Sequence, residues 1–146
     1  MRGMRRLALT VACVFAALPA AARDTFHDLS AEDAARSTLG EEKLLDVPFY
    51  LKGQKHPKVA QDLGVFTSNR RTNAFNKSDE KACEIAFLSA VIALQQRAKK
   101  EGGDAVVDIR SITKHNDLDS PTLYRCVAGN VVANVVLEGR VVRLAK

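Results

Sequence analysis

The chain has 146 residues and a formal net charge of +5, with 47% hydrophobic and 27% charged residues. These values are ordinary for a globular protein, so they exclude pervasive disorder and a polytopic membrane protein, and the length leaves no room for a large multidomain enzyme. Arg2, Arg5 and Arg6 supply much of the excess charge. The net charge by itself therefore does not indicate a nucleic-acid-binding protein.

Residues 1–22 are typical of a secretory signal peptide. The basic start is followed by an apolar stretch at residues 7–18 and by small residues at Ala20 and Ala22. As a helix the apolar stretch would span about 18 Å, short of a bilayer core of about 30 Å. We expect export, cleavage after Ala22 and no transmembrane span in the mature form; a lipoprotein acylated at Cys13 is the alternative.

Cleavage would remove Cys13 and leave Cys83 and Cys126 as the remaining thiols. Paired cysteines in an oxidising compartment usually form disulfides, so we expect a Cys83–Cys126 bond. Two buried free thiols are one alternative. A catalytic redox pair is another, although such pairs normally stand two residues apart at the start of a helix.

Residues 23–146 begin with short elements. Ser30, followed by acidic residues, predicts the N-cap of a short helix that Gly40 should end. Residues 47–51 have the composition of a peripheral strand, because Pro48 cannot donate to a sheet ladder. Residues 63–68 resemble a partner strand, and the two predict a loose hairpin across the polar residues 52–58.

The strongest predicted element is a long helix from Ser78 to about Glu101. Ser78, Asp79 and Glu80 suit a helix N-terminus, and apolar residues cover much of the helix circumference, so we expect it to form the centre of the core. Gly102 and Gly103 should provide its left-handed cap.

The remainder of the chain is predicted to be β-structure. Residues 104–112 and 122–127 resemble strands, residues 128–129 a bulge, residues 130–137 a continuation, and Glu138-Gly139 a two-residue hairpin turn before residues 140–144. Strands without intervening helices argue against a doubly wound nucleotide-binding fold. We therefore expect one α+β domain, residues 23–146, with one long buried helix packed on an antiparallel sheet and stapled by the disulfide.

Several segments resemble a family of small exported proteins of Gram-negative bacteria whose members are often named excinuclease subunits. The resemblance rests on residues 73–80, on Cys83 with the helix that follows it, and on residues 123–129 around Cys126. More distantly, residues 102–107 and Tyr124-Arg125-Cys126 are similar to the periplasmic domain of the lipoprotein that senses envelope stress for the Rcs phosphorelay. These resemblances imply a periplasmic, disulfide-stapled module that works through protein contacts, and they transfer no active-site residue.

The excinuclease name does not fit the chemistry of this sequence. ATP-driven recognition of damaged DNA needs a phosphate-binding loop of the form G-x-x-x-x-G-K followed by Ser or Thr, and the sequence has none. It also lacks the paired cysteines of a zinc site. We therefore expect no excision-repair function.

Catalytic and metal sites are not indicated. His27, His56 and His115 lack the spacing that brings two imidazoles to one metal, and residues 115–119 offer clustered oxygen ligands without the pattern of a calcium loop. Ser89 lies within an apolar helix and is interpreted as a packing residue. We expect no catalytic residue, cofactor or metal.

The most distinctive surface feature is the basic segment, defined as residues 52–77. It carries Lys52, Lys55, Lys58, Arg70, Arg71 and Lys77 against Asp62 alone. Such a cluster could bind an envelope protein or an anionic envelope surface, whereas export makes nucleic acid an unexpected partner; an ordinary solvated loop is the alternative. We expect a non-catalytic periplasmic or envelope protein, a binding or stress-related interaction module that acts through this segment, with a small periplasmic enzyme as the alternative.

Overall fold

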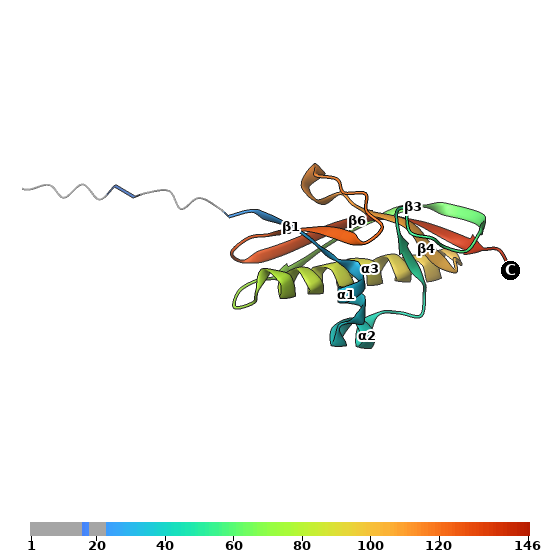
Figure 1. The fold of residues 1–146 in the computed structure, drawn as a ribbon, viewed down its shortest axis with the longest axis horizontal. Helices are drawn as coiled ribbons and strands as arrows, with labels where there is room; N and C mark the ends of the chain where they lie inside the picture. The colour runs from blue at the N-terminus through green and yellow to red at the C-terminus, as the bar shows by residue number, and fades with distance from the viewer. Residues whose placement is uncertain (1–15, 18–22) are drawn as a thin grey trace, which may run out of the picture.

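The computed structural model describes residues 16–17 and 23–146, so almost all of the expected signal peptide lies outside the described residues. The regular elements follow one another along the chain as shown in Figure 1. They are β1 (Thr25–Ser30), α1 (Ala31–Arg36), α2 (Thr38–Lys43), β2 (Phe49–Leu51), β3 (Val59–Asn73), α3 (Asp79–Glu101), β4 (Ala105–Ser111), the 3-10 turn η1 (Thr113–His115), β5 (Leu123–Ala128) and β6 (Val132–Leu144).

Helix α3 begins and ends where its sequence predicts. The Ser78 hydroxyl accepts a hydrogen bond from the Lys81 N–H at 3.1 Å, which satisfies one of the unpaired donors of the first turn. At the other end Gly102 takes the left-handed conformation, with φ of 76°. Its N–H reaches back to the carbonyls of Ala98 and Lys99.

Strand β6 is the centre of the sheet. On one side it pairs antiparallel with β3 along almost its whole length. On the other side it pairs with β5 near its start and with β4 over its second half. At the outer edge β1 pairs with β5, and β2 pairs with β4. The result is a six-stranded sheet in which every strand is positioned through β6.

Helix α3 covers one face of this sheet (Figure 1). Alternate side chains of β6, including Val135, Leu137 and Val141, are buried in one cluster with Phe87 and Leu94 of α3. The expected fold class is therefore confirmed: an α+β fold with one long, largely buried helix on a sheet.

The sheet is mixed, because β2 runs parallel to β4 while the other pairs are antiparallel. The predicted hairpin between residues 47–51 and 63–68 is accordingly wrong. After β2 the chain passes through β3 and α3 before it returns as β4, and such a long crossover allows parallel pairing. Strand β3 pairs instead with β6, with Phe66 opposite Gly139 and Ser68 opposite Leu137.

Two glycine predictions are also wrong. Gly40 lies inside α2 instead of ending the first helix, because Ser37 ends α1 and its hydroxyl caps α2 by accepting from the Gly40 N–H at 3.0 Å. Gly139 lies inside β6, which continues through the predicted turn at Glu138-Gly139. The turn that joins β5 to β6 lies earlier, where the Gly129 N–H donates to the Val132 carbonyl at 2.9 Å.

Gly139 is needed because α3 approaches the sheet closely at this point. A Cβ atom there would lie 2.8 Å from Val106 Cγ1 and 3.2 Å from both Ile109 Cγ1 and Leu94 Cδ1. These three side chains are buried, so they have little space into which to move.

The predicted disulfide is present. Cys83 on α3 is bonded to Cys126 on β5, with Cα atoms 5.8 Å apart, and both residues are fully buried. Beside the bond Phe87 stacks on Tyr124 with ring centroids 4.0 Å apart. The cross-link therefore joins the helix to the sheet within the core.

Replacing both cysteines, as Cys83→Ser with Cys126→Ser, should lower the free energy of unfolding by about 4 kcal/mol, because the unfolded chain regains the entropy of an open loop. Urea unfolding of the oxidised protein and of the double variant measures the difference. Equal stability of the two proteins would contradict a structural role for the bond.

Gly139→Val should lower the free energy of unfolding by about 1–3 kcal/mol or more, because the added side chain overpacks the contact between α3 and β6. Thermal or urea unfolding measures the loss. Gly129→Val, in the connection between β5 and β6, provides a comparison at a real turn. An unchanged stability of Gly139→Val would mean that the position is open, as a hairpin turn would be.

Candidate functional site

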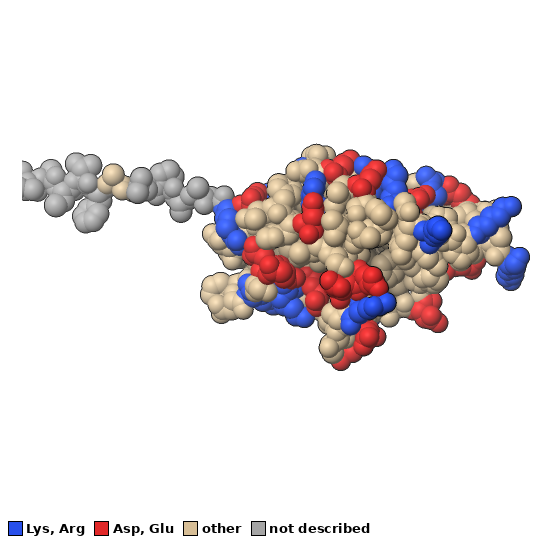
Figure 2. Space-filling model, in the orientation of Figure 1, with Lys and Arg blue, Asp and Glu red and all other residues tan. Residues whose placement is uncertain are grey.

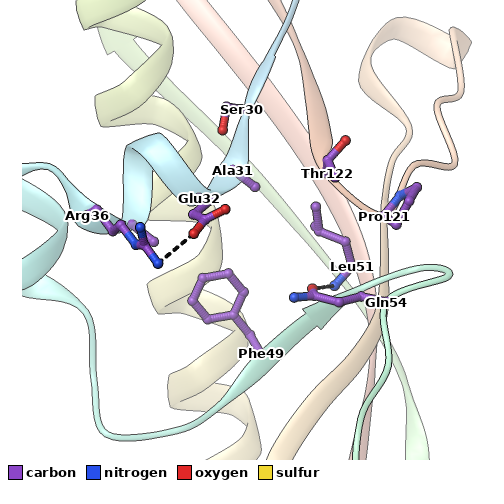
Figure 3. Close-up of a pocket in the computed structure, with 10 residues that line it drawn as sticks. Ser30, Ala31, Glu32, Arg36, Phe49, Leu51, Gln54, Pro121 and Thr122 are labelled. Carbon is purple, nitrogen blue, oxygen red and sulfur yellow. Dashed lines mark hydrogen bonds and ion pairs between the residues drawn. The ribbon is translucent and has the colours of Figure 1, made fainter.

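A large cavity lies where the outer edge of the sheet is interrupted. Strand β1 pairs with β5 and strand β2 pairs with β4, so a gap remains between the end of β1 and β2. Helix α1 and residues 121–122 border this gap and form a cleft with a volume of about 580 Å³ (Figure 3).

The lining of the cleft is mixed, with Ser30, Glu32, Arg36, Gln54 and Thr122 as its polar members. Ala31 of α1, Phe49 and Leu51 of β2, and Pro121 supply apolar surface. At its border Glu32 and Arg36 form an ion pair with 2.6 Å between Oε1 and Nη2 (Figure 3).

Gln54 closes the β2 side of the cleft. Its Oε1 accepts the Leu51 N–H at 2.9 Å, and Figure 3 shows its amide nitrogen on the side toward Phe49. Because the only ionisable side chains that line the cleft, Glu32 and Arg36, are paired with each other, the cleft suits an apolar group better than proton-transfer chemistry.

The structure divides the basic segment between two ends of β3. Lys52, Lys55 and Lys58 precede the strand, and Lys52 is paired with Asp119 at 3.0 Å. Arg70, Arg71 and Lys77 lie near or beyond its other end. At about 3.3 Å per residue, the strand separates Lys58 from Arg70 by roughly 40 Å. The six cations therefore do not form one patch, and Figure 2 shows acidic and basic side chains interspersed on the face it presents.

Arg70 and Arg71 lie on opposite faces of β3. Arg70 is opposite Val135, whose side chain is in the core against α3, and Arg71 is opposite Asn134. Because side chains alternate along a strand, the two adjacent cations point to opposite surfaces of the sheet.

An exposed apolar surface lies at the end of the molecule where β3 stops, and the sequence analysis did not identify it. We define the apolar end as Phe75, Val131 and Val132, which are 64%, 63% and 42% exposed. The turn before α3 and the turn before β6 meet here, since the Ala74 N–H donates to the Val131 carbonyl at 2.7 Å. The available sequence signal was the presence of large apolar residues in two turns.

The oxygen-rich turn at residues 115–119 is held by arginines. Arg110 contacts Asp119 at 2.5 Å and Asp117 at 2.9 Å, and the hydrogen bond from Arg110 lowers the pKa of Asp119. Arg125 likewise pairs with Asp28 at 2.7 Å, and this bond lowers the pKa of Asp28. The first two pairs tie the turn to β4, and the Asp28–Arg125 pair joins the neighbouring strands β1 and β5.

His27 and His56 lie outside this turn, whereas His115 is its first residue. His27 Nε2 is 2.9 Å from Asp79 Oδ2, and His56 Nδ1 is 2.8 Å from the Pro57 oxygen. Within residues 16–17 and 23–146 no group of three His, Cys, Asp or Glu side chains could hold a metal ion. Over the same residues, the structure contains no helix with the length and apolar character of a membrane span.

Comparison of the chain with protein-family models, with curated proteins and with solved structures found no match.

The Asp28–Arg125 pair should make stability depend on pH in the acid range. Because the pKa of Asp28 is lower in the folded protein, the pair stabilises the fold above the ordinary pKa of 3.8 and loses this contribution as pH falls through the lowered value. The difference in free energy of unfolding between the wild type and Asp28→Asn should therefore shrink below about pH 4. Glu42→Gln, an exposed carboxylate in α2, is the matched control, and urea unfolding across pH provides the measurement.

Proposed function

We propose that this protein is a non-catalytic component of the bacterial cell envelope that attaches to an anionic membrane surface through its apolar end. The observation that carries the proposal is the exposure of Phe75 and Val131 on two adjacent turns. Burial of such side chains in the interfacial region of a bilayer is favourable, and neither turn conformation requires a large apolar residue.

Cations flank the apolar end. Arg71 lies on β3 close to its end, and Lys77 follows the Phe75 turn, where its Nζ donates to the Asn73 carbonyl at 3.0 Å. Neither side chain forms an ion pair with another described residue. Near an anionic leaflet each such cation contributes about 1 kcal/mol of attraction.

Arg23, the first residue after the expected cleavage position, lies beside the apolar end. The Arg23 guanidinium donates to the Gly129 carbonyl at 2.8 Å and to Asn130 Oδ1 at 3.1 Å, next to the exposed Val131. Export through the N-terminal signal expected from the sequence would bring the protein to the cell envelope. The resemblance to exported envelope proteins agrees with this placement.

The alternative function, a small periplasmic enzyme, has less support. The large cleft is the natural place for a substrate, yet its lining offers Glu32 and Arg36 as a mutual pair and no histidine, cysteine or aspartate. A general acid or base requires an ionisable group that is available to the substrate.

Flotation with lipid vesicles tests the proposal. The protein should bind vesicles of phosphatidylethanolamine with phosphatidylglycerol, and Phe75→Ser with Val131→Ser should weaken this binding about tenfold or more, because each apolar side chain contributes on the order of 1–2 kcal/mol when buried. Val65→Ser is the matched control, since Val65 is 47% exposed but lies within β3, away from the apolar end.

The charge contribution is tested separately. Arg71→Gln with Lys77→Gln should weaken binding to the anionic vesicles about tenfold or more, and added salt should weaken the wild type in the same way. Lys55→Gln with Lys58→Gln, at the other end of β3, should have little effect. Absence of wild-type binding to anionic vesicles, or equal losses in the two charge variants, would overturn the proposal.

A further inference from the structure

Ser68 stands out among the buried polar residues of the fold. It is 5% exposed, and its Oγ is the one buried side-chain oxygen or nitrogen among the described residues that has no hydrogen-bond partner. Its position opposite Leu137 places it on the α3 face of the sheet, where an alanine would pack without this cost. A molecule bound in the cavity that Ser68 lines would supply this missing hydrogen bond.

Ser68 lines a cavity of about 230 Å³ between β3 and α3. Phe66 and Arg70 lie two residues before and after it on the same strand, and Leu94 and Arg97 line the helix side. The cavity is at the unpaired edge of the sheet, since β3 pairs with β6 alone among the described strands. A small molecule can therefore reach it from solvent without opening the core.

The charged groups at this cavity are predominantly positive. Arg97 lies over the Phe66 ring, 4.6 Å from the ring centroid, and also contacts Glu101 at 3.3 Å. Arg70 forms no ion pair with a described residue, and its polar contact is a 3.4 Å hydrogen bond to the neighbouring Asn69 carbonyl. One carboxylate thus faces two guanidinium groups, which leaves Arg70 available for an anion.

We propose that this cavity binds a small organic acid through its carboxylate. Arg70 and Ser68 donate hydrogen bonds to the carboxylate, and Arg97 provides the second positive charge. A guanidinium group matches the planar carboxylate with two parallel donors. Within a lining that is otherwise mostly polar, Leu94 and the Phe66 ring supply the apolar contacts. These suit the short aliphatic part of an organic acid, whereas inorganic phosphate would place charged oxygens against them.

This site is independent of the apolar end. Arg70 faces α3, whereas Arg71, which flanks the apolar end, is on the opposite face of β3. Arg71→Gln is therefore a matched control for Arg70→Gln: both remove one cation, one residue apart, from the same strand.

Binding is measured by nuclear magnetic resonance titration at constant ionic strength, with acetate, butyrate, succinate and inorganic phosphate as separate probes. Butyrate or succinate should shift the amide signals of residues 66–70 and 93–97. Arg70→Gln and Arg97→Gln should each raise the dissociation constant about tenfold, the effect of losing a charge-assisted hydrogen bond or a close cation, while Arg71→Gln should change it less than about twofold.

Ser68→Ala separates binding from packing. It should raise or preserve the melting temperature of the unliganded protein, because it removes an unpaired buried hydroxyl, and it should weaken binding about fivefold through the lost hydrogen bond. The proposal is overturned if none of the organic acids shifts these signals, if phosphate binds more tightly than they do, if Arg71→Gln weakens binding as much as Arg70→Gln, or if Ser68→Ala leaves binding unchanged.

Discussion

The contact between β6 and α3 determines the arrangement of the remaining elements. β6 is the strand through which β3, β4 and β5 are brought together, and its alternate side chains form the floor on which α3 packs. At Gly139 a Cβ atom would lie 2.8 Å from Val106 Cγ1 of β4 and within 3.2 Å of Leu94 on α3, so the position admits no larger residue without a shift. The Cys83–Cys126 bond then ties the first turns of the same helix to β5, so that the helix and the sheet are joined both by packing and by a covalent link.

The candidate sites follow from how the other strands are attached to β6. Because β4 and β5 pair with different parts of β6, the outer strands β2 and β1 do not meet, and the cleft beside α1 occupies the gap between them. Because β3 pairs with β6 alone, its outer edge and the cavity beside Ser68 are open to solvent. The apolar end lies where β3 and β6 reach the turns that connect them to their neighbours.

Local signals predicted the parts of the fold that depend on local physics. The bounds of α3 follow from Ser78 at one end and Gly102 at the other. The disulfide was predicted from two cysteines and an expected oxidising compartment, and the bond is present. Strand pairing was predicted poorly because it joins residues that are distant in sequence. Glu138-Gly139 is typical of a turn, but Gly139 lies within β6 where α3 and β4 come close. Residues 63–68 pair with β6 and not with residues 47–51. The basic segment was treated as one cluster because its residues are close in sequence. In the structure, however, β3 separates the first three cations from the last three, and Arg70 and Arg71 point to opposite faces of the strand.

Residues that folding does not require are the best indication of binding surfaces in this protein. The core between α3 and β6 is apolar and closely packed, so a serine at position 68 without a partner, like a phenylalanine at the exposed turn position 75, adds nothing to it. Sequences usually agree with their fold at every level, and departures concentrate at functional positions. The disulfide contributes stability that can offset such departures. Because Ser68 lies between β3 and α3 whereas Phe75 lies in the turn before α3, and because the two sites involve different cations, loss of one binding activity should leave the other intact. A combined variant should show the two losses independently.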